Sequence, residues 1–345
     1  MAEYFHLSEV DPELAPLLSS IPPFVFDENT AIDAVRKGYE QFASQVIQPN
    51  YAPLLPESHG YTVKDHYIDV GDGAKVLARH IVPVPRGDED TFPLLFWIHG
   101  GGFLLGDIQM DDYKLRIASV KLRISIVNCE YRLAPEHPFP TAVNDLTAAL
   151  KYVASRPKAF SAALEKGFIL GGASAGGNLA AVLSFVTRDD DFYKDKPITG
   201  QLLHVPNVVH PQAYPEKYKS SLLSLEQNKD APQMTKDFLV KFQEIYNGPP
   251  TDPRVSPLLL PTHKGLPPAF IQVCGLDPLR DEGLLYEKVL KEAGVPTKLE
   301  VYPGVSHGFE NVFFNIKQAV KLREDFHPGL EWLLQQVRER SVSGI

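Results

Sequence analysis

Cysteine is scarce in this chain. Its 345 residues include two cysteines, Cys129 and Cys274, and both lie inside apolar, strand-like runs. A small secreted domain held by disulfides needs more cysteines, and a cysteine zinc site needs them in close pairs. We therefore predict two buried thiols. We expect no disulfide framework, no metal site and no metal or organic cofactor.

Basic residues are also fewer than acidic ones: the chain has 34 Lys and Arg against 43 Asp and Glu, which gives a net charge of −9. The basic residues are scattered and form no stripe with aromatics, which argues against a nucleic-acid partner. The most apolar segment, PLLFWIHGGGFLLG, is too short and too broken by glycine to span a bilayer. The first residues, MAEYFHLSEVDPELAPLL, carry early acids, unlike a signal peptide. We expect a cytoplasmic protein without a membrane span.

What the chain does contain is an alternation of two patterns. Hydrophobic residues make up 44% of it and charged residues 22%, an ordinary globular balance that allows a large core. Strand-like runs alternate with helical stretches near Thr30–Val46, Thr141–Val153, Gly283–Ala293 and Lys317–Val337, and the runs are PLLFWIHG, ISIVNCEY, GFILGGAS, ITGQLLHV, PAFIQVCG and KLEVYPG. Such alternation is typical of an α/β fold with a mostly parallel sheet covered on both faces. A hairpin at Asp72-Gly73 would form its antiparallel edge.

One segment interrupts the alternation. After QLLHVPNVVHP, a long stretch without a strand contains the amphipathic helix TKDFLVKFQEIY, whose apolar side carries Phe238, Leu239, Phe242, Ile245 and Tyr246. We interpret this segment as a lid over a site. The alternative is a surface excursion that packs on the core. No internal repeat or low-complexity linker divides the chain, so we expect one domain with a cap.

A serine stands among glycines in FILGGASAGGNLAAVL, where Gly172 to Gly176 match G-x-S-x-G. The motif follows a strand-like run and opens a helix, the context in which a nucleophilic serine is raised on a tight turn. A P-loop would need Lys-Ser or Lys-Thr after the last glycine, and the G-x-G-x-x-G spacing is absent. We predict Ser174 as the nucleophile. The alternative is a tight strand-to-helix turn with a harmless small residue.

A serine hydroxyl needs a base to react near neutral pH. The order Ser, acid, His continues in AFIQVCGLDPLRDEG, which ends a strand at Asp277, and in KLEVYPGVSHGFE, which delivers His307. We expect His307 to take the proton from Ser174 and Asp277 to orient its imidazole. Asp281 and Glu282 are rival acids, but they fall in the first turn of a helix, where the dipole favours acids. Asp277 could alternatively cap that helix.

The glycines of HGGGF, His99 to Phe103, follow another strand. Backbone N–H groups converging there would form an oxyanion hole, with Gly101, Gly102 and Ala175 as donors. The alternative is an ordinary flexible turn. We interpret His99 as a residue that supports the loop rather than as the base, because it precedes Ser174 in the sequence and the expected order is Ser, acid, His. We also favour a structural role for His204 and His210, with a place in the lining of the site as the alternative, and their spacing is a weak metal signal.

These blocks together resemble the hormone-sensitive-lipase-like branch of the α/β-hydrolases, which includes bacterial, fungal and plant carboxylesterases. The resemblance rests on HGGGF, YRLAPEHPFP at Tyr131–Pro140, the corner at Gly171–Asn178, DPRVSPLL at Asp252–Leu259, DPLRDEG at Asp277–Gly283 and HGF at His307–Phe309. It implies the α/β-hydrolase fold, the triad Ser174, Asp277 and His307, and a helical cap from residues 1–55 and 206–250. The core would then comprise residues 56–205 and 251–345.

The resemblance also bounds the expected function. We expect a serine carboxylester hydrolase that takes a small-molecule ester with a short- to medium-chain acyl group and works as a monomer or homodimer. The same site also suits a lactonase, an amidase or a cyclising acyl transferase. A third hypothesis is a non-catalytic small-molecule receptor, as the gibberellin receptors are in this family, but His307 argues against it. Ala173 departs from the polar residue usual beside the family's serine, so the subfamily stays open.

Overall fold

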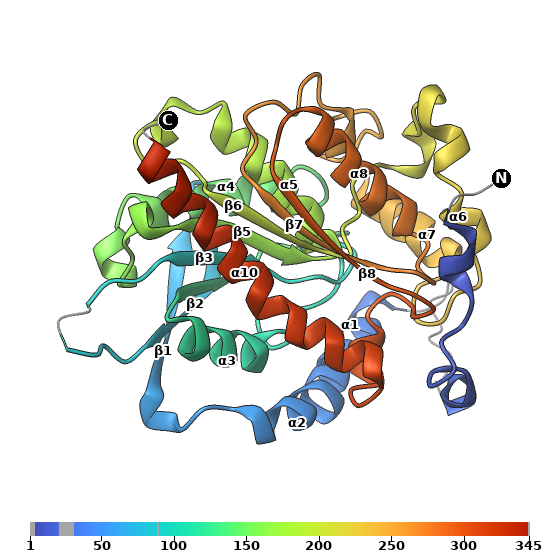
Figure 1. The fold of residues 1–345 in the computed structure, drawn as a ribbon, viewed down its shortest axis with the longest axis horizontal. Helices are drawn as coiled ribbons and strands as arrows, with labels where there is room; N and C mark the ends of the chain where they lie inside the picture. The colour runs from blue at the N-terminus through green and yellow to red at the C-terminus, as the bar shows by residue number, and fades with distance from the viewer. Residues whose placement is uncertain (1–3, 21–30, 88–89, 344–345) are drawn as a thin grey trace.

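The computed structural model describes residues 4–20, 31–87 and 90–343, and it arranges them around one eight-stranded sheet (Figure 1). The order of the strands across the sheet is β1-β2-β4-β3-β5-β6-β7-β8. Their bounds are β1 Tyr61–Asp69, β2 Lys75–Pro83, β3 Leu94–Ile98, β4 Ser125–Cys129, β5 Phe168–Ala173, β6 Gly200–His204, β7 Ala269–Cys274 and β8 Thr297–Tyr302.

The six strands from β4 to β8 across the sheet are mutually parallel, and β2 is antiparallel to both of its neighbours, β1 and β4. The hairpin of β1 and β2 lies at the edge and turns at Asp72-Gly73, where Val70 N–H bonds the carbonyl of Ala74. The predicted α/β fold class and its antiparallel edge are therefore confirmed.

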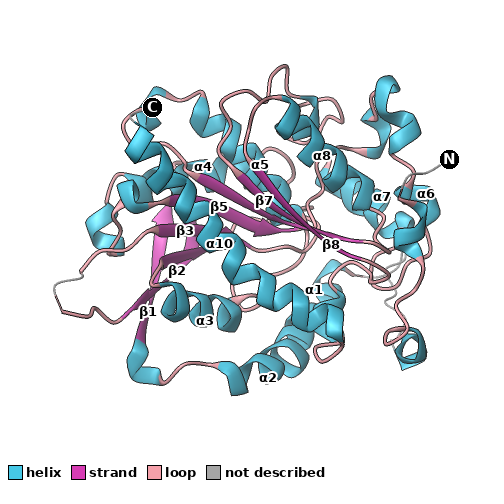
Figure 2. Ribbon diagram, in the orientation of Figure 1, coloured by secondary structure: helices cyan, strands magenta, loops and turns pink. Residues whose placement is uncertain are grey.

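Helices cover both faces of the sheet (Figure 2). α3 and α10 lie on one face, and α4, α5 and α8 lie on the other (Figure 1). The α-helices are α1 Ile32–Phe42, α2 Gln48–Tyr51, α3 Asp112–Leu122, α4 Thr141–Ala154, α5 Ala175–Arg188, α6 Ser224–Gln227, α7 Lys236–Tyr246, α8 Arg280–Glu292, α9 Phe309–Val312 and α10 Lys317–Ser343. None of the described helices is long and apolar enough to cross a membrane.

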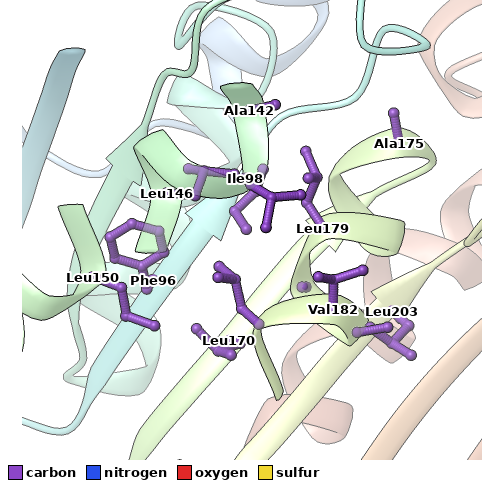
Figure 3. Packing of buried hydrophobic residues seen from close by; sticks show 14 of the residues in the cluster. Phe96, Ile98, Ala142, Leu146, Leu150, Leu170, Ala175, Leu179, Val182 and Leu203 are labelled. Carbon is purple, nitrogen blue, oxygen red and sulfur yellow. The ribbon is translucent and has the colours of Figure 1, made fainter. Parts of the chain in front are cut away.

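The core between the sheet and the α4–α5 face follows the predicted periodicity. Figure 3 shows Leu146 and Leu150 of α4 beside Phe96 and Ile98 of β3, with side chains of α5 on the neighbouring strands. The five positions of α4 expected on one face, Ala142, Leu146, Ala149, Leu150 and Val153, are all buried. The central strands β3 and β4 are buried on both faces because helices cover both of them. β3, LLFWI, is continuously apolar, whereas β4 also buries Ser125 and Asn128, which donate to the carbonyls of Phe160 and Ile108.

Three predicted helix boundaries were inaccurate. α8 begins at Arg280 rather than Gly283, because the backbone of the Asp277 loop already turns there and Arg280 N–H bonds its carbonyl. α10 continues to Ser343 and contains Pro328. The first α-helix, α1, ends at Phe42, and a π-helix, Ala43–Ile47, follows it directly. Thr30 lies outside the described residues.

Two segments far apart in the chain lie beside each other. Gln227, at the end of α6, donates from its side chain to the carbonyl of Phe5 in the N-terminal segment. Arg36 of α1 donates to the carbonyls of Leu104 and Ala134 and pairs with Glu136. The N-terminal segment is thereby fixed to the loops that follow β3 and β4.

Candidate active site

Ser174 occupies the corner between β5 and α5. Its backbone has φ 54° and ψ −116°, a conformation that a residue with a side chain rarely adopts. A Cβ on Gly172 would strike the backbone of Gly176, and a Cβ on Gly176 would strike the carbonyls of Ile98 and His99. The corner therefore requires glycine at both positions, as the motif predicted.

The structure brings Ser174, His307 and Asp277 into one hydrogen-bonded chain. The Oγ of Ser174 lies 2.9 Å from Nε2 of His307, and Nδ1 of His307 lies 2.7 Å from Oδ2 of Asp277. A proton on Nδ1 would donate to the carboxylate and leave Nε2 to accept from the serine. All three side chains come from loops after the carboxyl ends of β5, β7 and β8.

The electrostatics of His307 favour its protonated form. Burial acts to lower the pKa of its imidazole, but the charge and hydrogen bond of Asp277 and the charge of Glu310 outweigh burial and raise it. A base whose cation is stabilised in this way suits a reaction in which it must accept a proton. Asp277 is only 1% exposed, and its second oxygen accepts the N–H of Leu279.

The rival acids lie elsewhere in the network. Asp281 accepts the N–H groups of Leu223 and Ser224, and its carboxylate pairs with Arg280. Glu282 accepts hydrogen bonds from the N–H groups of Val208 and Val209, from the amide of Asn207 and from the hydroxyl of Tyr214. These two acids bind the 206–250 segment, so Asp277 alone of the three meets His307.

The HGGGF loop lies directly against the serine corner. Ile98, the last residue of β3, pairs with Gly172 of β5, and a Cβ on Gly100 would lie 2.9 Å from the carbonyl oxygen of Ala173. Gly101 and Gly102 both have positive φ, 116° and 62°. Among the loop and turn hydrogen bonds of the described residues, the N–H groups of Gly101 and Gly102 donate to no backbone oxygen. Ala175 is the first residue of α5, and the first N–H groups of a helix have no acceptor within the helix. Three donors thus remain available near Ser174.

The other histidines of the motifs have structural contacts. His99 is buried, its Nδ1 lies 2.7 Å from the carbonyl of Gly100, and its ring stacks on Tyr131 at 4.5 Å. The Nδ1 of His210 accepts the N–H of Gln212 and so caps a short helical turn. His204 forms a buried pair with Glu310 at 2.9 Å, while its carbonyl accepts the N–H of Ser174.

Several residues of the site network could not be recognised from the sequence. Asn228 donates to the carbonyl of Asp277, and Ser224 donates to the carbonyl of Pro278, so the 206–250 segment supports the acid loop. Ser306, beside His307, donates to the side chain of Gln233. The only sequence signal was Asn178, a polar residue on the apolar face of α5, which donates to the carbonyls of Asn207 and Val255.

Cys129 and Cys274 are buried free thiols, and burial raises the pKa of each. Within the ranges that the structure describes, no group of three or more His, Cys, Asp and Glu side chains is arranged to hold a metal ion.

Comparison with known proteins agrees with this geometry. A family described as the alpha/beta hydrolase fold matches residues 95–311. An AB hydrolase superfamily protein of Schizosaccharomyces pombe is 38% identical over 334 residues, which cover 96% of each chain. The versiconal hemiacetal acetate esterase of Dothistroma septosporum is 32% identical, with 86% of this chain and 87% of that protein covered. A vibralactone cyclase crystal structure superposes with a TM-score of 0.92 at 40% identity, covering 96% of this chain and 97% of the other. The chain therefore belongs to the α/β-hydrolase family, as its motifs predicted.

Proposed function

We propose that this protein is a serine carboxylester hydrolase whose triad is Ser174, His307 and Asp277. The observation that carries the proposal is the continuous hydrogen-bonded chain from Oγ of Ser174 through both ring nitrogens of His307 to Oδ2 of Asp277. Its place in a family shared with a named esterase supports the same activity.

In this mechanism the Oγ of Ser174 attacks the ester carbonyl while Nε2 of His307 takes its proton. The carbonyl oxygen becomes an oxyanion, and the N–H groups of Gly101, Gly102 and Ala175 would bind it. The imidazolium then protonates the leaving alcohol, and Asp277 stabilises its charge. Water, deprotonated by His307, releases the acid from the acyl-enzyme.

We propose that the substrate is an uncharged ester with a short- to medium-chain acyl group, and that residues 1–55 and 206–250 form a cap over it. Within the first of these ranges, residues 1–3 and 21–30 lie outside the described residues. The apolar side of α7 supports this proposal: a Cβ on Gly102 would strike the ring of Phe242, and Tyr246 stacks on Phe103 at 3.9 Å. An apolar side chain beside the oxyanion loop favours an apolar acyl or alcohol group.

The test is hydrolysis of p-nitrophenyl esters from acetate to dodecanoate by the wild type, by Ser174→Ala and by the exposed control Ser155→Ala. We expect Ser174→Ala to lower kcat by roughly four to six orders of magnitude, and the control to match the wild type. The kcat/KM of the wild type should fall for esters whose acyl chain is longer than medium length. A Ser174→Ala variant with wild-type turnover would overturn the nucleophile assignment.

A second candidate is intramolecular acyl transfer or lactone chemistry, which the superposition with a vibralactone cyclase favours. The triad would be the same, but an internal nucleophile would replace water. Turnover of lactones in preference to open-chain p-nitrophenyl esters, again lost in Ser174→Ala, would support this candidate over ester hydrolysis. Tight binding of esters without turnover would instead support the receptor hypothesis.

A further inference from the structure

Gln233 has a strained backbone in the 206–250 segment. Its φ is 67°, and the N–H of Met234 donates to the carbonyl of Pro232 at 2.8 Å, which makes Gln233 the central residue of a three-residue γ-turn. γ-turns with a positive φ at the central residue are rare and strained, above all when that residue is not glycine. Such strain persists only where the surrounding structure fixes it, and it is concentrated at functional sites. The turn is therefore a candidate for a functional role.

The side chain of Gln233 connects this turn to the loop that carries His307. Its Oε1 accepts the hydroxyl of Ser306, which directly precedes His307 and is fully buried. Its Nε2 is buried and has no hydrogen-bond partner among the described residues. A buried donor without a partner is unfavourable for folding. Two features that disfavour folding thus coincide at the residue that contacts the loop of His307, which is the pattern expected of a functional position.

The residues that precede this turn hold the loop of Asp277. Nδ2 of Asn228 donates to the carbonyl of Asp277 at 2.9 Å. Oγ of Ser224 donates to the carbonyl of Pro278 at 2.8 Å. Residues 224–233 therefore bind the loops of both the acid and the base of the proposed triad. Because these loops follow different strands, β7 and β8, the segment fixes their position relative to each other.

We propose that Gln233 is a positioning residue that holds His307 in place through Ser306, an inference that rests on the proposed triad. The ring of His307 is within hydrogen-bond distance on both sides, 2.9 Å from Oγ of Ser174 and 2.7 Å from Oδ2 of Asp277. A displacement of the base by about 1 Å lengthens these contacts and can lower the rate by about two orders of magnitude. The γ-turn directs the side chain of Gln233 to Ser306, which gives the strained backbone its function.

The experiment compares Gln233→Ala with Gln233→Gly in hydrolysis of p-nitrophenyl butyrate and in urea unfolding. Both variants lose the amide that holds Ser306, but only glycine also relieves the backbone, because it adopts positive φ freely. We expect both to lower kcat equally, by about tenfold, with KM within about twofold of the wild type. The urea midpoint of Gln233→Gly should be higher than that of Gln233→Ala. A residue needed only for stability would instead separate the two variants in the midpoint and leave kcat unchanged.

Two further measurements test the route through Ser306. Ser306→Ala removes the same hydrogen bond from its other end, so its combination with Gln233→Ala should be no slower than the slower single variant. Asp277 and Glu310 are the charged groups that raise the pKa of His307. A ring that shifts away from Asp277 should have a lower pKa, so the acid limb of the kcat/KM profile should move to lower pH in both Gln233 variants.

Ser161→Ala and Ser161→Gly form the matched control pair. Ser161 also has a positive φ, 47°, but it lies in the loop between α4 and β5. Its carbonyl accepts the N–H of Phe92 ahead of β3, at the end of the sheet opposite the triad loops. There glycine should again be more stable than alanine, while both variants keep the wild-type kcat.

Hydrolysis by the wild type separates the two proposals. A wild type that hydrolyses no ester overturns the proposed function, and with it the role of Gln233. An active wild type with unchanged kcat in both Gln233 variants overturns the role of Gln233 alone. Losses that multiply in the double variant, or an acid limb that does not move, also overturn that role.

Discussion

The corner that carries Ser174 and the 206–250 segment are stabilised by different interactions. The corner is determined by backbone sterics, since side chains at Gly172 and Gly176 would strike the main chain. The 206–250 segment is held by side chains of distant residues, above all Glu282, whose carboxylate accepts from Asn207, Val208, Val209 and Tyr214.

This difference determines how each region tolerates change. A clash with the backbone cannot be relieved by a change of side-chain rotamer, so the corner accommodates an added methyl group only if its main chain shifts. A side-chain anchor can be replaced by another group of similar shape that satisfies the same donors. Substitutions in the two regions should therefore separate loss of the corner from loosening of the segment.

The largest effect is expected for Gly176→Ala. Its Cβ would lie inside van der Waals contact with the carbonyls of Ile98 and His99, so the corner must shift and displace Ser174 from His307. Esterase activity should fall at least about a hundredfold, and the free energy of unfolding should fall by roughly 3 kcal/mol. Ester kinetics and urea unfolding measure the two effects.

Gly38→Ala is the matched control, because a Cβ there meets nothing within 4 Å in the middle of α1. Its activity should be unchanged, and its stability should equal or exceed that of the wild type, since alanine favours a helix over glycine. Wild-type activity in Gly176→Ala would contradict the steric explanation of the corner.

Glu282→Ala should give the next largest effect and should act on stability. It leaves the N–H groups of Val208 and Val209 buried without an acceptor, so the free energy of unfolding should fall by about 2–3 kcal/mol. Glu282→Gln keeps one oxygen for these donors and should lose less. The exposed Glu292→Gln, at the end of α8, is the control and should match the wild type in urea unfolding.

The same pair of variants has a pH signature. Burial raises the pKa of Glu282 to about 8, so the folded protein keeps a proton that the unfolded chain releases above the ordinary pKa of 4.5. The stability that this proton contributes is complete below 4.5 and is lost as pH rises to about 8. Unfolding of Glu282→Gln should lack this part of the pH dependence. An identical slope in wild type and Glu282→Gln would refute it.

The contrast between the two regions also explains which features could be predicted from the sequence. Local patterns identify the parallel sheet, its hairpin edge, the apolar face of α4 and the glycine corner, because each depends on residues close together in the chain. Ser174, Asp277 and His307 each follow the carboxyl end of a parallel strand, so their order along the chain was enough to predict that their side chains lie close together. The structural roles of Asn228 and Glu282 could not be predicted, because tertiary packing selects their hydrogen-bond partners.

Gly102→Ala tests where the two regions touch. Its Cβ would strike the ring of Phe242 on α7, and alanine also strains the positive φ, so esterase activity should fall about tenfold. The double variant Gly102→Ala with Phe242→Ala removes the clash and should recover part of the loss. A double-mutant cycle on kcat/KM measures the coupling. Purely additive effects would show that the 206–250 segment does not press on the HGGGF loop.

Glu310→Gln should have the smallest effect, on pH dependence alone. Burial lowers the pKa of His307, whereas the charges of Asp277 and Glu310 raise it. Removing the charge of Glu310 should therefore lower that pKa and move the acid limb of the kcat/KM profile to lower pH, because that limb reports the free base. The amide oxygen can still accept from Nε2 of His204, so the plateau rate should change little. The exposed Glu324→Gln on α10 should leave the profile unmoved; an acid limb equally unmoved in Glu310→Gln would mean that Asp277 alone sets the basicity of His307.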